Sequence, residues 1–192
     1  MAENPNEVYS KPQRTLHWIV AGLIITTVLV AFTMDGKFGK VPDAVAGFLY
    51  DSHKLIGITI FFLVLARLAF RLTRGAPPQE PTVPPLQRMA AELTHWTMYA
   101  LLIMVPIGGY VALQYYGEIR LFGALPLPSF DEPDKELSER LFSIHRLAAY
   151  VLIGLVVLHF SAAMLHRFIL NDNVLGRMWP SQLRRNRDLP GN

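Results

Sequence analysis

Four long apolar stretches set the strongest limit on what this chain can fold into. They cover residues 17–34, 55–70, 95–113 and 147–170, and each is close to the length that an α-helix needs to cross a bilayer. A segment surrounded by lipid must satisfy its backbone hydrogen bonds internally, as a helix does. With 52% hydrophobic and only 17% charged residues, a soluble bundle is the weaker alternative. The sequence therefore predicts an all-α integral membrane four-helix bundle.

The predicted spans are approximately 13–34, 50–72, 88–114 and 138–170, within a single membrane domain covering 1–192. Residues 171–192 form a basic tail. Lysine and arginine are concentrated in the connections on the side that both termini share, which predicts a multi-pass protein with both termini in the cytoplasm. Because basic residues are expected after a last membrane helix, the tail gives no reason to expect nucleic-acid binding.

The absence of cysteine narrows the chemistry. It excludes disulfides, thiolate-bound iron–sulfur clusters and the covalent attachment of a c-type haem. A bound metal would have to use nitrogen or oxygen ligands.

Histidines are the main chemical feature of the predicted helices. His53 and His145 lie near the starts of the second and fourth helices, on the outer side. Toward the inner side lie His17, His95, His159 and His166. Fourteen residues separate His145 from His159, which places them on one face of a helix about 21 Å apart. Ionisable side chains inside a membrane are costly, so they are candidates for function.

The outer level contains only two histidines, whereas zinc or copper would need three or four converging ligands. Two imidazoles on opposite faces of a porphyrin are sufficient for a b-type haem, because the macrocycle supplies the other four iron ligands. Two levels of histidine then imply two haems. Depth alone leaves open whether His17 or His95 pairs with His159 at the inner level.

Several motifs resemble those of the bacterial cytochrome b561 family, and they occur in the same order. They are RTLHW at 14–18, SHKLIG at 52–57, LARLAFRL at 65–72, VPIGGY at 105–110, IHRLAAY at 144–150, and LHFSAAMLHRFILNDNVLGRM at 158–178. The similarity extends from residue 9 to about residue 180. It implies a four-helix cytochrome of the bacterial inner membrane with two b haems between the helices and ubiquinone as a redox partner.

The resemblance also implies the ligand pairs. His17 and His159 would hold the inner haem iron, and His53 and His145 the outer one. The remaining inner-side candidates for quinone or haem-propionate contacts are His95, His166, Arg14, Arg67 and Arg71. Many members have two adjacent histidines where this chain has His166 and Arg167, which argues against a role that needs the second imidazole.

Two cations follow the outer ligands directly. Lys54 and Arg146 would border the outer haem, where in superoxide-oxidising members positive charge would attract the small anion. The leading interpretation is a di-haem cytochrome that transfers electrons across the membrane to or from the quinone pool. Its leading enzymatic form is a superoxide:ubiquinone oxidoreductase. The alternative is a non-catalytic cytochrome b subunit that transfers electrons for a periplasmic redox partner, a dehydrogenase or a hydrogenase.

Overall fold

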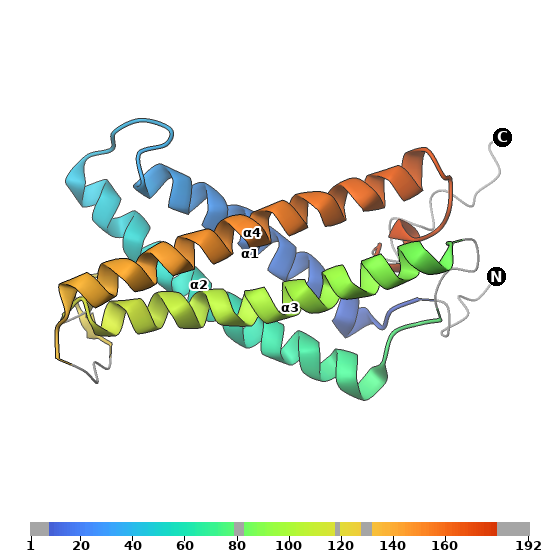
Figure 1. Ribbon diagram of the computed structural model, residues 1–192, viewed down its shortest axis with the longest axis horizontal. Helices are drawn as coiled ribbons and strands as arrows, with labels where there is room; N and C mark the ends of the chain where they lie inside the picture. Colours follow the sequence, from blue (N-terminus) through green and yellow to red (C-terminus); the bar gives the residue numbers. More distant parts are fainter. Residues whose placement is uncertain (1–7, 79–82, 118–119, 128–131, 180–192) are drawn as a thin grey trace.

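A computed structural model describes residues 8–78, 83–117, 120–127 and 132–179 (Figure 1). Its long elements are four helices: α1 (Lys11–Met34), α2 (Asp43–Arg74), α3 (Pro85–Gln114) and α4 (Lys135–Phe168). A two-stranded antiparallel hairpin, β1 (Arg120–Leu121) and β2 (Leu125–Pro126), lies between α3 and α4. A short 3₁₀ helix, η1 (Leu175–Arg177), follows α4. The starts of α1 and α3 and the ends of α2 and α4 form the near end of the bundle, and the opposite helix termini form the far end.

Local sequence explains where the helices begin and end. At the start of α1, the Gln13 side chain accepts hydrogen bonds from the Ser10 amide at 3.1 Å and the Ser10 hydroxyl at 2.8 Å. Asp134 caps α4 by accepting from the Leu137 amide at 3.0 Å. Helix α2 stops before Gly75, whose φ of 70° suits glycine. Each of these three boundaries therefore has a recognisable cap or breaker.

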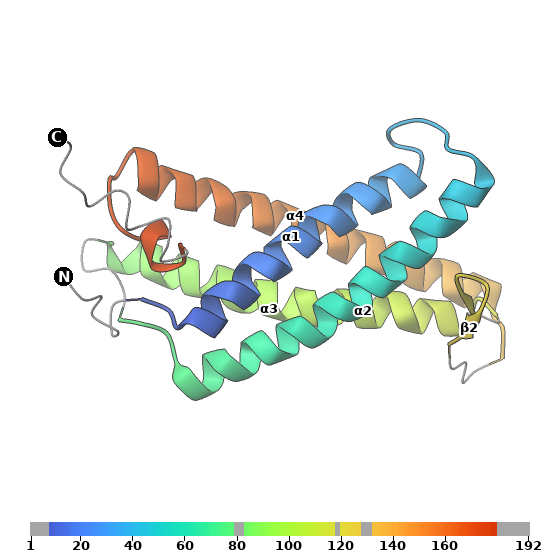
Figure 2. The same ribbon diagram turned by 180° about the vertical axis from the view of Figure 1, so that it is seen from behind.

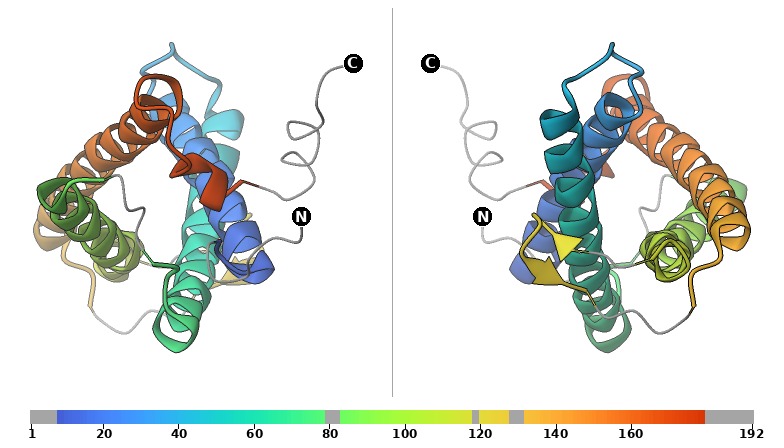
Figure 3. Two further views of the ribbon diagram at one scale, coloured as in Figure 1. Left: turned by 90° about the vertical axis from the view of Figure 1, so that its right-hand side faces the viewer. Right: turned by 90° about the vertical axis from the view of Figure 1, so that its left-hand side faces the viewer.

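The helices associate as two antiparallel pairs, α1 with α2 and α3 with α4, and the two pairs cross each other (Figures 1 and 2). Figure 3 shows the pairs on opposite sides of the bundle when it is viewed from its ends. All four helices contribute to one small apolar core, formed by Val20, Ile24, Ile60, Val64, Leu102 and Leu152.

Large apolar side chains cover the outside of the bundle as well. Within the apolar parts of the four helices, Ile25, Phe62, Met104 and Phe160 each expose about 60% of their surface. An apolar belt of this kind would be unstable against water but is suited to lipid. All four helices are long and apolar enough to cross a membrane, in agreement with the predicted four-helix membrane bundle.

Helix α2 is longer than the sequence breakers indicate. It begins at Asp43, so that His53 lies ten residues inside the helix instead of near its start. Pro42 directly before the helix and the acidic Asp43 in the first turn both favour a helix start here. His145 likewise lies ten residues after the start of α4, so the two far-end histidines are about 15 Å along their helices.

The chain after α4 folds back onto the near end. Trp18 donates from Nε1 to the Met178 carbonyl at 2.8 Å, and Arg14 donates to the Trp179 carbonyl at 3.3 Å. The beginning of the predicted basic tail therefore packs against α1. Its remainder, 180–192, lies outside the described residues.

Candidate haem sites

The far-end pair consists of His53 from α2 and His145 from α4. Their ring centres are 6.3 Å apart and the ring planes are inclined by 85°. His145 donates from Nδ1 to the backbone carbonyl of Val105 at 2.9 Å, and His53 Nδ1 lies 3.3 Å from the Thr27 hydroxyl. Because both Nδ1 atoms have partners, each ring has its Nε2 available for another ligand.

The His145 ring packs closely against helix α3. A Cβ atom at Gly109 would lie 3.0 Å from two atoms of the His145 ring, so only glycine lets the ring approach this closely. Gly109 follows Pro106, which lacks an amide proton and so interrupts the hydrogen bonding of α3. Two residues of the VPIGGY sequence therefore contact His145: Gly109 lets the ring approach α3, and the Val105 carbonyl accepts its hydrogen bond.

Three histidines meet toward the near end. His159 of α4 has its ring centre 6.3 Å from that of His17 on α1, with the planes inclined by 78°. It is also 5.2 Å from the ring centre of His95 on α3, at 69°. The structure therefore brings both of the sequence candidates next to His159.

These distances can be compared with what a haem requires. With metal–nitrogen bonds of about 2 Å and roughly 1.1 Å from the nitrogen to the ring centre, two trans imidazoles have centres about 6.3 Å apart. The pairs His53–His145 and His17–His159 both have this separation, whereas His95–His159 is shorter. Within the described residues no cluster of three or more metal-binding side chains forms an alternative metal site. The donor set therefore fits two bis-imidazole haems.

Arg67 forms a hydrogen bond with His17 of the near-end pair. It donates from Nη1 to His17 Nδ1 at 2.5 Å and from Nε to the Tyr99 hydroxyl at 3.1 Å. A guanidinium has no acceptor, so His17 Nδ1 must accept, and a neutral His17 then has its proton on Nε2. Haem ligands usually donate from the other ring nitrogen instead. Ligation through His17 Nε2 therefore favours a position of Arg67 away from the ring.

A small polar cavity adjoins this cluster. It has a volume of about 40 Å³ and is lined by Tyr9, Gln13, Arg67, Arg71, His95, Tyr99 and Met178. Arg71 donates to the Tyr9 hydroxyl at 3.1 Å. Arg14 lies elsewhere at the near end, beside a wider cavity of about 580 Å³ that also contains Lys11 and Arg74. Arg67, Arg71 and His95 are thus grouped together, and Arg14 is not part of this group.

Comparison with known proteins identifies the family. The profile described as prokaryotic cytochrome b561 matches residues 8–181. The chain belongs to the prokaryotic cytochrome b561 family. It is therefore a multi-pass membrane electron carrier, and membership of this family implies that it binds haem b.

Individual b561-family relatives cover nearly the whole chain. The "Probable superoxide oxidase CybB" of Yersinia pestis is 30% identical over 174 residues, which is 91% of this chain and 97% of that protein. "Cytochrome b561 homolog 1" of Escherichia coli K12 is 29% identical over 90% of this chain and 97% of its own length. "Cytochrome b562" of Cereibacter sphaeroides is 29% identical over 93% and 98%, respectively.

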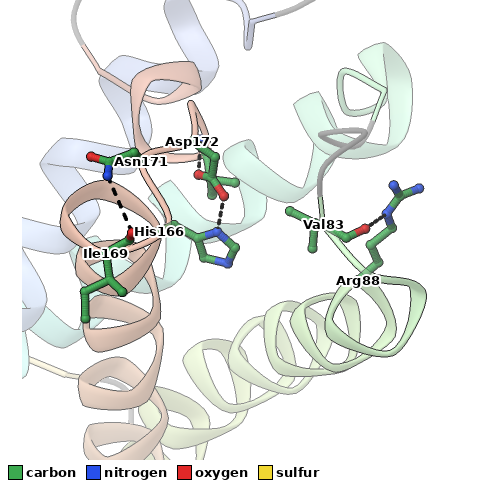
Figure 4. A network of polar contacts seen from close by, with 7 residues as sticks. Val83, Arg88, His166, Ile169, Asn171 and Asp172 are labelled. Carbon is green, nitrogen blue, oxygen red and sulfur yellow. Dashed lines mark hydrogen bonds and ion pairs between the residues drawn. The ribbon is translucent and has the colours of Figure 1, made fainter.

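One hydrogen-bonded side-chain pair in this b561-family chain was not predicted from the sequence. His166, near the end of α4, donates from Nδ1 to Asp172 Oδ2 at 2.5 Å (Figure 4). The signal was present in the sequence as an acidic residue six positions after the histidine. A pairing at this spacing requires the chain to turn back, which periodicity does not reveal.

The two cations that directly follow the far-end histidines of this cytochrome b561 differ in their surroundings. Lys54 forms a 2.9 Å ion pair with Asp51, and Asp51 also accepts from the Phe122 amide at 2.8 Å. Arg146 is exposed and donates to the Ser143 hydroxyl at 3.4 Å. Arg146 is therefore the stronger source of positive potential at this end.

Proposed function

We propose that the chain holds two b haems and oxidises superoxide while reducing ubiquinone. Two superoxide anions, one ubiquinone and two protons give two dioxygen molecules and one ubiquinol, which balances atoms, charge and electrons. The observation that carries the proposal is that two histidine pairs, His53–His145 and His17–His159, have the same 6.3 Å between their ring centres. Each pair includes one histidine of α4. Haem b bound by these pairs would supply one-electron carriers at two depths of the bilayer.

The choice of His17 over His95 rests on ring spacing. The 5.2 Å between the centres of His95 and His159 leaves too little room for a metal between two trans imidazoles, whereas 6.3 Å is sufficient. We therefore assign His17 and His159 to the near-end iron. His95 remains beside the pair as a contact for a propionate or for the quinone.

The arginines would serve the propionates. Arg67 and Arg71 project toward one cavity, where their hydrogen-bond partners are neutral tyrosine hydroxyls and the ring of His17. Two cations grouped without a carboxylate among these partners are suited to binding carboxylates of a ligand. Arg67 would hold a propionate in place of its present hydrogen bond to His17 Nδ1. Arg14 donates to the Trp179 carbonyl and is the weaker candidate.

The positive-inside rule gives the orientation. Both termini, and with them the near end, are assigned to the cytoplasmic side of the bacterial inner membrane, with residues 1–192 as one membrane domain. The far-end pair then lies toward the periplasm. Superoxide formed outside the cell membrane would meet the far end first, and quinone in the bilayer would meet the near end.

A cation beside the far-end histidine pair supports an anionic substrate. Arg146 directly follows His145 and is exposed, so it can attract a small anion toward this pair. Lys54 contributes less because Asp51 balances its charge. The Yersinia pestis relative is named a probable superoxide oxidase, which agrees with this substrate.

Stopped-flow spectroscopy tests the proposal. Purified full-length protein is mixed with superoxide, and the absorbance of the reduced haem is followed before a short-chain ubiquinone is added. We expect reduction by superoxide to be much faster than by weak neutral donors of similar potential, followed by ubiquinol formation. Equal rates for superoxide and the neutral donors would instead favour the carrier subunit of a partner dehydrogenase or hydrogenase.

A further inference from the structure

The segment that follows α4 turns back, so that the carboxylate of Asp172 contacts His166 in the last turn of the helix. Asn171 has a φ of 53°, in the left-handed region, and reverses the chain directly after the helix. The Asp172 amide then donates to the His166 carbonyl at 3.2 Å, which closes the end of the helix. The same reversal brings the Asp172 side chain to His166 Nδ1 at 2.5 Å (Figure 4).

The Asp172 carboxylate is held at both oxygens. Oδ2 accepts from His166, and Oδ1 accepts from the Val174 amide at 3.1 Å. Only 14% of the His166 side chain and 9% of the Asp172 side chain are exposed. By contrast, the ion pair between Arg140 and Glu136 has both side chains more than 70% exposed. The His166–Asp172 pair is therefore fixed in position and partly shielded from solvent, unlike an ordinary surface pair.

This arrangement determines which nitrogen of His166 is available. An ionised carboxylate only accepts hydrogen bonds, so Nδ1 must be the protonated nitrogen. Within the described part of the chain, His166 Nε2 has no hydrogen-bond partner. Figure 4 shows the ring extending from α4 toward the side where Arg88 lies on α3, and Arg88 itself donates to the Val83 carbonyl at 2.6 Å.

We propose that Asp172 is a positioning residue that holds His166 with Nε2 directed at a quinone bound at the near end. The inference rests on the proposed function and deepens it by naming the proton donor. Reduction of a quinone consumes two electrons and two protons. His166 gives one proton from Nε2 to a quinone carbonyl oxygen, which becomes a hydroxyl, and recovers a proton from the cytoplasmic water. The second proton reaches the other carbonyl oxygen from the same water.

Asp172 acts by fixing the ring and its tautomer, with the Nδ1 proton directed at the carboxylate. It keeps its own charge throughout, and the Nδ1 proton stays between the two residues, as in other carboxylate–histidine pairs. Replacing a carboxylate that orients a metal-binding histidine typically lowers activity about 10- to 100-fold, and we expect a loss of similar size for this pair. The effect should be confined to the quinone step, because neither residue belongs to the four assigned haem ligands.

The test measures the quinone step alone. Full-length wild type, Asp172→Asn, His166→Gln and the double variant are reduced with stoichiometric dithionite and mixed with a short-chain ubiquinone in a stopped-flow instrument. We expect Asp172→Asn to reoxidise about 10- to 100-fold more slowly, with a larger solvent deuterium isotope effect and unchanged haem content and spectrum. The double variant should be no slower than His166→Gln, because Asp172 acts through His166.

Two results would overturn the inference: a wild-type rate in Asp172→Asn, or independent, multiplying effects in the double variant. If Asp172→Asn loses haem, Asp172→Glu decides, because it restores the carboxylate. Recovery of most of the rate supports the positioning role, and a rate as low as that of His166→Gln contradicts it. A wild-type protein that ubiquinone cannot reoxidise would refute the proposed function itself, and the inference with it.

Discussion

The carbonyl oxygen of Val105 on α3 accepts a hydrogen bond from His145 Nδ1 on α4 at 2.9 Å. This contact fixes the orientation of the ring and leaves its Nε2 available to bind a metal. Backbone carbonyl partners of this kind are typical of histidines that bind metals, because they select the tautomer and increase the basicity of the ligand. Helix α3 supplies neither histidine of the far-end pair, yet it orients one of them through this hydrogen bond.

Gly109 is expected to be essential for that arrangement. In Gly109→Ala the new Cβ would be 3.0 Å from the His145 ring, so the ring must shift from its position beside α3. We predict loss of the far-end haem, or a shift in its absorption band, with the near-end haem retained. Gly22→Ala is the control, because nothing lies within 4 Å of its Cβ position on an exposed part of α1. Equal spectra for the two variants would contradict the role of Gly109.

The near-end ligands can be separated by haem content. We predict that His17→Ala removes one haem per chain, because this ring has the spacing from His159 that ligation requires. His95→Ala should keep both haems, since its ring is too close to His159 for a metal between them. The measurement is the ratio of haem b to protein in each purified variant. The reverse pattern would assign His95 as the ligand.

Arg67 should raise the reduction potential of the near-end haem. A nearby positive charge disfavours the oxidised iron, so Arg67→Gln is predicted to lower the midpoint potential by on the order of tens of millivolts. Arg74→Gln is a matched control on the same helix, because this exposed residue lies at the end of α2. Redox titration followed by optical spectroscopy gives both potentials. A shift of the same size in Arg74→Gln would show that the effect does not depend on the location of Arg67 beside the near-end haem.

Arg146 should affect the encounter with superoxide. Arg146→Gln is predicted to slow haem reduction by superoxide several-fold at low salt and to weaken its dependence on ionic strength. Lys54→Gln should have a smaller effect, since Asp51 already balances the charge of Lys54. Stopped-flow rates over a series of salt concentrations provide the comparison. If neither variant changes the salt dependence, attraction by these cations is refuted.

Ser138 links α3 and α4 at the far end. It is fully buried, and its hydroxyl donates to the Ala112 carbonyl at 2.9 Å. Ser138→Ala should destabilise the protein by about 1 kcal/mol, because the hydrogen bond is lost inside the interface. Ser143→Ala is the control, since this exposed hydroxyl bonds only within its own helix. Thermal unfolding in detergent, followed by haem release, should show a lower midpoint for Ser138→Ala alone.

The sequence was sufficient for the features that depend on composition and helical period. Long apolar stretches identify the four helices, and the fourteen-residue spacing of His145 and His159 places them on one face at two depths. It could not predict features that depend on contacts between helices. The distance from His159 to His17 and to His95 depends on the crossing of the two helix pairs, and the start of α2 at Asp43 was obscured by nearby glycine and proline. Asp172 meets His166 only because Asn171 reverses the chain.

Haem content in the wild type and in His145→Ala tests the central claim most directly. Purified from haem-replete cells, the wild type should contain about two b haems per chain, one for each histidine pair. His145→Ala should contain about one and lose the spectral component of the far-end haem, while the near-end component remains. A colourless wild type, or a His145→Ala protein that keeps both haems with unchanged spectra, would contradict the account.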